Sequence, residues 1–201
     1  MFTLLLIMLF VSYGSWNFVA ASILLFAFIA FFFRDPDREI GEGVVSPADG
    51  RIDFMEGKRM EIFLGPFDCH VIRSPVQGVV EKVVYKKGKF RPAFWRDEDN
   101  ERNEIYIRNE KGTFKVVQMA GIFARRIICR VEEGDEVKKG ERIGAIIFGS
   151  RVVLQVPEEV VFVKRVGEKV KAGETVGYEA GHEARYEARY EMGYEIGYEA
   201  G

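Results

Sequence analysis

The sequence is poor in histidine and cysteine, the side chains that most often bind transition metals or, for cysteine, form disulfide bonds. It contains two histidines, His70 and His182, and two cysteines, Cys69 and Cys129, with no Cys-x-x-Cys spacing among its 201 residues. Widely separated single cysteines predict two reduced thiols, and so few candidate ligands predict no metal site. The formal net charge of −2 also lacks the basic excess with which a domain attracts nucleic acid. We therefore expect neither a metalloenzyme nor a nucleic-acid-binding protein.

The first 33 residues contain no charged side chain, although Asp, Glu, Lys and Arg make up 30% of the whole chain. A stretch this long and apolar predicts a hydrophobic helical membrane segment. A signal peptide is the alternative, but no basic region begins the segment and no small-residue cleavage site precedes Arg34. Because the polar break SYGSWN (12–17) divides the segment, one tilted span and a re-entrant hairpin both stay open. Arg34 and Arg38 follow directly, which predicts attachment to the cell membrane with the rest of the chain on the cytoplasmic side.

Residues 34–177 contain many short runs of Val, Ile and Phe separated by turns with glycine. Such runs predict β-strands, and no window keeps the 3.6-residue period of an amphipathic helix. Two segments echo each other, since EEGDEVKKGERIG (132–144) and RVGEKVKAGETVG (165–177) place glycines at matching turns. SPADGRI and SPVQGVV form a second pair. We therefore predict a mainly β fold, a compact β-sandwich or barrel with lipoyl-like paired hairpins and rough internal symmetry.

The same paired hairpins are typical of lipoyl- and biotinyl-carrier domains and of the related domains of membrane-fusion adaptors. A carrier needs its modified lysine at a hairpin tip, typically beside Met or Asp. The tips DEVKKGE and EKVKAGE lack that setting. One hypothesis for the function is therefore a membrane-anchored, lipoyl-like adaptor domain that binds a partner without catalysis.

One strand-like run, AIIFGSRVVLQVP (145–157), is interrupted by Gly149 and Ser150. Glycine contributes little to a strand interior, so the dipeptide favours either a β-bulge or a site of chemistry. The serine hydroxyl can attack the preceding carbonyl, because glycine has no side chain to block the approach and tolerates unusual backbone angles. An N-to-O acyl shift followed by elimination then cuts the chain and leaves a pyruvoyl group. The dipeptide alone does not decide between the two.

The wider set of motifs is more specific. The chain contains, in order, FFFRDPDR, VVSPADGRI, IFLGPFDCHVIRSPVQGVV, GKFRPAFW, NERN, AGIFARRIICRV and GDEVKKGERIGAIIFGSRVVLQVP. From about Phe31 to Val176 this set closely resembles the short, single-domain phosphatidylserine decarboxylases, including the archaeal archaetidylserine decarboxylases. The resemblance implies a pyruvoyl-dependent enzyme that converts a serine phospholipid into the ethanolamine phospholipid and CO₂. It also implies a zymogen that cleaves itself at Gly149-Ser150.

The implied cleavage yields a larger chain, 1–149, and a smaller chain, 150–201, which stay associated. The pyruvoyl group derived from Ser150 would form a Schiff base with the substrate amine and take up the charge of the developing carbanion. No separate cofactor is then needed. Nothing in the sequence distinguishes ester-linked from ether-linked lipid chains.

The family's motifs imply two further catalytic side chains. Asp49 in SPADG would orient a base and stabilise its charged form, although an Asp-Gly turn explains the same residues on backbone grounds alone. His70 in FDCHVIRSP would transfer protons, and it is the only histidine before the tail. Longer members of the family carry a second histidine where this chain has Arg73. Whether His70 serves both self-cleavage and decarboxylation, or another group is the base for cleavage, therefore stays open.

Several basic side chains are candidates to bind the phosphate and carboxylate of the substrate, because a guanidinium group pairs with both by two hydrogen bonds. They are Arg73, Arg102, Arg125 and Arg126. Structural ion pairs are the alternative for each of them. In the loop-like stretch GKFRPAFWRDED, Phe94 and Trp95 are candidates for the membrane interface, where aromatic residues are enriched.

Residues 178–201 repeat Tyr or His every four residues, with Glu after each. A period of four keeps these side chains on one slanting stripe of a helix, which the inserted glycines weaken. We interpret the segment as a low-complexity tail, either solvated or used for self-association into a homo-oligomer.

Overall fold

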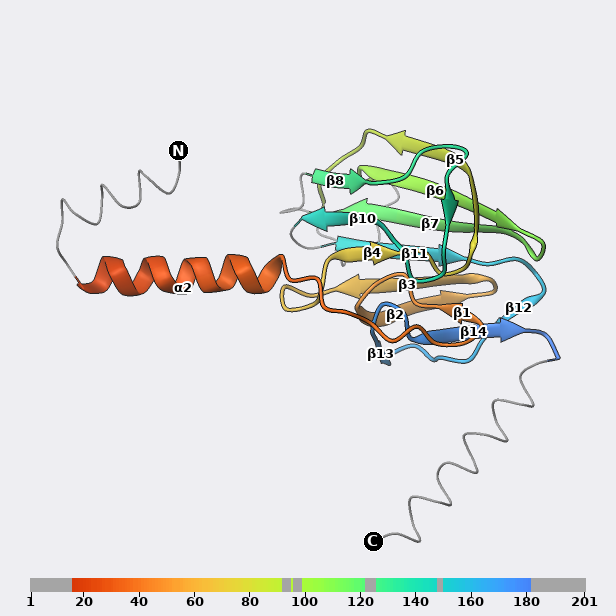
Figure 1. The fold of residues 1–201 in the computed structure, drawn as a ribbon, viewed down its shortest axis with the longest axis horizontal. Helices are drawn as coiled ribbons and strands as arrows, with labels where there is room; N and C mark the ends of the chain where they lie inside the picture. Colours follow the sequence, from red (N-terminus) through yellow and green to blue (C-terminus); the bar gives the residue numbers. More distant parts are fainter. Residues whose placement is uncertain (1–15, 92–94, 96–98, 122–125, 148–149, 182–201) are drawn as a thin grey trace, which may run out of the picture. The chain divides into compact units, whose positions relative to one another are not determined.

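The computed structural model describes residues 16–91, 95, 99–121, 126–147 and 150–181, and of Trp16 and Ser150 only the backbone (Figure 1). Two compact units make up the chain, residues 1–36 and residues 37–201. The first unit is helical in its described part, and the second is built from β-strands.

The helix of the first unit is α2 (Trp16–Phe32), with 17 residues and no charged side chain. Its apolar residues are spread around the whole circumference, so it has no polar face to turn to water. At about 1.5 Å per residue it is about 26 Å long, shorter than the roughly 30 Å core of a bilayer. Among the described residues, no helix is both long and apolar enough to cross a membrane. The predicted membrane span is therefore wrong for α2, whereas residues 1–15 lie outside the described part.

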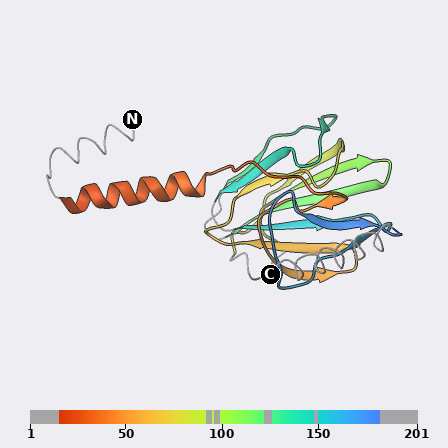
Figure 2. The same ribbon diagram turned by 60° about the horizontal axis from the view of Figure 1, so that its bottom comes forward.

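The second unit is built on a curled sheet of eight antiparallel strands, a half-barrel rather than a closed barrel (Figures 1 and 2). Across the sheet the order is β13 (Lys169–Val170), β2 (Gly50–Glu56), β3 (Arg59–Leu64), β11 (Ser150–Gln155), β7 (Gly112–Ala120), β6 (Arg102–Asn109), β5 (Gly78–Lys86) and β9 (Glu136–Val137). Alternate residues of these strands enter one core, as Val152 and Leu154 of β11 do. The mainly β class predicted from the runs of Val and Ile is thus confirmed.

Two smaller antiparallel sheets repeat one arrangement. One has the order β1 (Val44–Val45), β14 (Thr175–Glu179), β12 (Val160–Phe162), and the other has the order β4 (Val71–Arg73), β10 (Arg142–Ile147), β8 (Arg126–Cys129). Matching hydrogen bonds fix the two hairpins. The Ser46 amide donates to the Glu174 carbonyl, and the Ser74 amide donates to the Glu141 carbonyl, each over 2.7 Å. The two serines are those of the paired SPADG and SPVQG motifs.

The two repeats also bond to each other in a reciprocal way. The Val45 amide donates to the Pro75 carbonyl over 3.0 Å, and the Arg73 amide donates to the Pro47 carbonyl over 2.8 Å. Each repeat thus gives and receives the same contact, which is the pattern of a pseudo-two-fold axis. The rough internal symmetry predicted from the paired motifs is present in the fold.

The last described strand extends into the predicted tail. β14 finishes at Glu179, whose Cα partner is Val160 of β12. The β-rich unit therefore includes the first residues of the segment 178–201. Residues 182–201, on which the predicted stripe and self-association fall, lie outside the described part.

Candidate active site

Ser150 is the first residue of β11, in the middle of the eight-stranded sheet. Its Cα partners are Leu64 at the end of β3 and Ala120 at the end of β7. A chain cut before Ser150 would keep β11 paired with both neighbours, because the registered pairs run from Ser150 to Gln155 on each side. The sheet itself would hold the two chains together. Gly149, and with it the geometry of the scissile bond, lies outside the described residues.

Both ends of the loop between β3 and β4 are fixed to β10 and β11, the strands that come before and after Gly149-Ser150 in the sequence. The loop begins after Leu64, the Cα partner of Ser150. It finishes at His70, whose carbonyl accepts a hydrogen bond over 3.1 Å from the Ile146 amide in β10. Because β10 leads into the dipeptide and β11 leads out of it, this arrangement places His70 at the same end of the sheet as Ser150.

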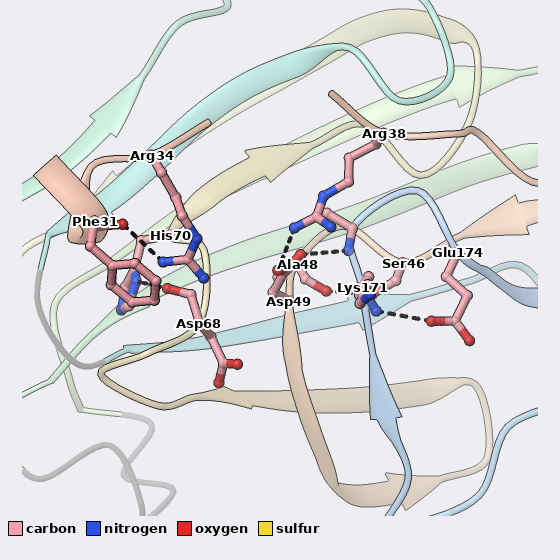
Figure 3. A network of polar contacts seen from close by, with 11 residues as sticks. Phe31, Arg34, Arg38, Ser46, Ala48, Asp49, Asp68, His70, Lys171 and Glu174 are labelled. Carbon is pink, nitrogen blue, oxygen red and sulfur yellow. Dashed lines mark hydrogen bonds and ion pairs between the residues drawn. The ribbon is translucent and has the colours of Figure 1, made fainter. Parts of the chain in front are cut away.

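The His70 ring is buried, and the loop fixes its orientation. Its Nδ1 lies 2.8 Å from the carbonyl oxygen of Asp68 (Figure 3). A carbonyl only accepts hydrogen bonds, so the neutral ring carries its hydrogen on Nδ1 and its lone pair on Nε2. The Asp68 carboxylate in turn accepts a hydrogen bond over 2.7 Å from the Gly65 amide, which closes the turn. His70 therefore has the tautomer that a proton acceptor at Nε2 needs.

Asp49 is buried immediately before β2, and both of its carboxylate oxygens have partners (Figure 3). Oδ1 accepts a hydrogen bond over 2.8 Å from the Ala172 amide, and Oδ2 pairs with the Arg38 guanidinium at 2.5 Å. The carbonyl of Asp68, and not this carboxylate, orients the His70 ring at Nδ1. The partnership with Arg38 was not predicted, because Arg38 reads in the sequence only as a charge after the hydrophobic segment.

The strand register relates Asp49 to Ser150. Arg51, two residues after Asp49, faces Phe63 in β3, which faces Arg151 in β11. Only β3 lies between β2 and β11, so the two strands are separated by about 10 Å at the usual strand spacing. Asp49 and Ser150 are therefore at the same end of the sheet, on strands separated by one neighbour.

Asn100, in the NERN motif, fastens the other neighbour of Ser150. Its side chain is buried, and Nδ2 donates to the Ala120 carbonyl over 3.1 Å and to the Arg91 carbonyl over 2.9 Å. Oδ1 accepts from the Arg91 amide over 2.9 Å. The side chain thus ties the end of β7 to the segment after β5. Sequence reasoning gave this motif no role, because a lone asparagine beside a strand has no local signature.

The three candidate substrate arginines that the structure describes are not brought together. Arg73 is buried, donates to the Gly140 carbonyl over 3.0 Å, and faces Arg142 at the end of β10 that is remote from Ser150. The other two described arginines begin strands at the Ser150 end: Arg126 is exposed and faces Ile147, and Arg102 binds Glu104. Arg125 and Phe94 lie outside the described residues, whereas the Trp95 side chain is 62% exposed.

Arg151, the residue after Ser150, is fully buried and holds the start of β11. Its guanidinium makes two hydrogen bonds of 2.7 Å to the Asp53 carboxylate in β2 and one of 2.6 Å to Glu61 in β3. Two parallel hydrogen bonds between a guanidinium and a carboxylate fix the orientation of the side chains and also add to the strength of the ion pair. Arg151 would therefore hold the start of β11 in place both before and after a cleavage. In the sequence it appears only as one charge in an apolar run.

These residues fit a group made from Ser150 itself. A serine begins a central strand, a buried histidine with a lone pair on Nε2 belongs to a loop anchored to β10 and β11, and Asp49 lies at the same sheet end. A pyruvoyl group at residue 150 would supply the electron sink that decarboxylation of an amino acid needs. Within the described ranges, no cluster of three or more His, Cys, Asp or Glu side chains is placed to hold a metal ion. The fold and site are compatible with a self-processing decarboxylase.

Comparison with known proteins assigns the family. The family model of phosphatidylserine decarboxylase matches residues 25–178. A putative archaetidylserine decarboxylase proenzyme of Archaeoglobus fulgidus is 64% identical over 149 residues, which are 74% of this chain and 76% of the relative. A second protein of that name, from Methanococcoides burtonii, is 41% identical over 80% of this chain and 79% of the relative. The phosphatidylserine decarboxylase proenzyme of Nitratidesulfovibrio vulgaris is 43% identical over 81% of this chain and 82% of the relative.

The chain belongs to the phosphatidylserine decarboxylase family. The resemblance inferred from the motifs is confirmed, and the chain is the proenzyme of a pyruvoyl-dependent decarboxylase of serine phospholipids. Its cofactor is made from one of its own serines, and its substrate is a membrane lipid.

Proposed function

We propose that the chain cleaves itself between Gly149 and Ser150, and that Ser150, His70 and Asp49 form the catalytic site of the resulting decarboxylase. The observation that carries the proposal is the loop between β3 and β4, which is fixed to β11 through Leu64 and to β10 through the His70 carbonyl. A denaturing gel separates this proposal from the adaptor hypothesis, because an adaptor without catalysis runs as one full-length band. The proposed enzyme runs as two bands, 1–149 and 150–201.

The cleavage chemistry follows from the groups at this sheet end. His70 Nε2 takes the proton from Ser150 Oγ, which attacks the Gly149 carbonyl carbon. The peptide C–N bond breaks, the nitrogen takes up that proton to become an amine, and an ester joins Gly149 to Oγ. Loss of the Ser150 Cα proton expels the Gly149 carboxylate. The remaining enamine hydrolyses with release of ammonia and leaves the pyruvoyl group.

In decarboxylation His70 has a second task. After CO₂ leaves the substrate, a proton must be added to the carbon that lost it, and a protonated imidazole can supply that proton. Both phosphatidylserine and archaetidylserine present the same phosphoserine head group. We therefore assign the reaction to that head group, with Arg102 and Arg126, which begin β6 and β8 at this end, as its candidate anion contacts.

Asp49 and Arg38 act together in the proposed site. The 2.5 Å ion pair and the hydrogen bond from Ala172 hold the Asp49 carboxylate in one position. A fixed negative charge at the sheet end stabilises the imidazolium that forms when His70 takes the serine proton. This proposed role is in self-cleavage, so we expect Asp49 to contribute less to turnover once the pyruvoyl group has formed.

Asp49→Asn tests this role, because it keeps the shape of the side chain and removes its charge. We expect self-cleavage to slow by about 100-fold, since loss of the carboxylate leaves the imidazolium and Arg38 uncompensated. The measurement is the fraction cleaved with time on a denaturing gel. Turnover per mature chain should change by only a few fold. Asp99→Asn is the matched control, because that carboxylate is exposed and forms an ion pair at the surface with Lys89. A wild-type cleavage rate in Asp49→Asn would remove the residue from the site.

We further propose that residues 1–33 hold the enzyme against the cytoplasmic surface of the membrane. In α2 the large apolar residues Phe26, Leu24 and Ile23 are 73%, 71% and 62% exposed. The helix therefore presents an apolar surface whose exposure to water is unfavourable. The substrate's chains cannot leave the bilayer cheaply, at roughly 0.8 kcal/mol per CH₂. An enzyme held at the interface needs to reach only the head group. Arg34, directly after the segment, favours the anionic cytoplasmic leaflet.

Deletion of residues 1–33 tests the segment as an aid to substrate access. Self-cleavage should stay largely intact, because Asp49, His70 and Ser150 all belong to the β-rich unit. Turnover on lipid in vesicles should fall at least tenfold, and turnover on a water-soluble, short-chain phosphoserine ester should fall much less. Equal losses on both substrates would show that the segment serves folding and not access.

A further inference from the structure

The outer face of the eight-stranded sheet carries a cluster of cations around one buried carboxylate. Glu104 of β6 is 2% exposed. Its Oε1 lies 2.9 Å from Lys86 Nζ and 2.9 Å from Arg102 Nε, and its Oε2 lies 3.0 Å from Lys115 Nζ and 2.9 Å from the Tyr106 hydroxyl. Three cations therefore surround one anion. We call Lys86, Arg102, Lys115 and Glu104 the Glu104 cluster.

The Glu104 carboxyl stays ionised in this setting. Burial alone raises its pKa, but the hydrogen bonds from Lys86, Arg102, Lys115 and Tyr106 outweigh burial and hold the pKa well below its usual range. The cluster therefore has two positive charges in excess at neutral pH. Beside the cluster, Arg59 and Arg151 are matched by Glu61 and Asp53.

The cluster lines a hollow in the sheet. The hollow has a volume of about 180 Å³, and Arg59 and Gln155 complete its polar wall. Its floor is apolar, formed by Val117 and Val153, which are buried. Each lysine ammonium has three N–H donors and gives one of them to Glu104. The remaining donors and the excess positive charge make the hollow complementary to a small anion with several acceptor oxygens.

One edge of the hollow lies near the Ser150 end of the sheet. Arg102 faces Met119 of β7, and Met119 faces Arg151 of β11, so the three form one row across the sheet. The next row along β11 contains Ser150. An anion held at Arg102 is thus two strands across the sheet and one residue along it from the serine. Glu104 works here as an organiser, since it gathers three cations that would otherwise repel one another.

We propose that the Glu104 cluster is a binding site for a phosphoryl anion, either the phosphate of a lipid head group at the membrane surface or free phosphate. Sequence reasoning singled out Arg102 alone. The structure adds Lys86 and Lys115 as donors and Glu104 as the group that positions them. The proposal does not depend on which residues cut the chain, so it can fail while the cleavage site stands.

The test uses the self-cleaved two-chain enzyme and inorganic phosphate. We expect saturable binding by calorimetry at low salt, and an affinity at least tenfold weaker in the double variant Lys86→Gln/Lys115→Gln. The matched control is Lys82→Gln/Lys87→Gln, which removes the same charge from exposed positions on and just after β5 that do not line the hollow. Lys86→Arg/Lys115→Arg should keep the affinity. Two bands on a denaturing gel verify that each variant has folded.

Vesicles distinguish the source of the phosphoryl group. If binding to phosphatidylcholine vesicles that contain phosphatidylglycerol falls with the double variant and not with the control, the site takes a lipid phosphate. If only phosphate binding falls, the site takes the free anion. Should the double variant not fold, Lys86→Gln alone gives the comparison, because that side chain is 44% exposed. Wild-type phosphate affinity in these variants, or no saturable binding to the wild type, would overturn the proposal.

Discussion

Ser150→Ala is expected to yield a single uncut chain with no decarboxylase activity. Without the hydroxyl no ester can form, and alanine offers no oxygen to expel in the elimination. The loss should be complete on both readouts, because the same atom starts the cleavage and leads to the cofactor. The measurement is a denaturing gel beside an assay for CO₂ release.

Ser150→Cys is the control for this variant. A thiol can still make the acyl shift, so slow cleavage is expected where alanine gives none. The fold should survive both changes, since Arg151 and the pairing of β11 with β3 and β7 do not involve the hydroxyl. An alanine variant that is processed and active would refute the assignment of the cleavage site.

His70→Asn is expected to lower turnover of the cleaved enzyme by roughly 100- to 10,000-fold, the usual contribution of a general acid–base group. An asparagine amide can take the place of the Nδ1–H and still donate to the Asp68 carbonyl, so the loop keeps its anchor. It has no group that accepts and returns a proton near neutral pH. His70→Ala should show the same loss with less stability.

The chain offers a matched control in His182→Asn, which changes the only other histidine. That variant should have wild-type turnover and cleavage. Kinetics must be expressed per cleaved chain, because His70 is also proposed to start the cleavage and slow maturation would mimic slow catalysis. Wild-type turnover in cleaved His70→Asn protein would exclude His70 from decarboxylation.

Local sequence patterns predicted the β-rich fold and its internal symmetry. SPADG and SPVQG are short, local motifs, and the fold contains them as matched bends with equivalent hydrogen bonds. The hydrophobic segment was also found, but its length of 33 residues suggested a span that the 17 residues of α2 do not provide. A hydropathy pattern gives composition and not the point where a helix begins.

The contacts that build the site are of longer range and were not predictable in this way. The Asp49 carboxylate accepts from the amide of Ala172, 123 residues further along the chain, and Arg151 binds Asp53 across 98 residues. Asn100 acts through a backbone carbonyl in another strand. Such contacts depend on strand register, which no window of sequence contains, so only the family motifs could indicate Asp49 and His70 beforehand.

The most direct test of the central claim is the intact mass of the smaller chain after purification under denaturing conditions. Cleavage at Gly149-Ser150 with formation of the cofactor predicts a fragment 150–201 that begins with a pyruvoyl group. Its mass should be lower than that of the same fragment with a serine amino terminus by the mass of one ammonia molecule. Its amino terminus should resist Edman degradation until a reductive amination converts the carbonyl. A fragment that begins at another residue, or one that begins at 150 with a free serine amine, would contradict the account.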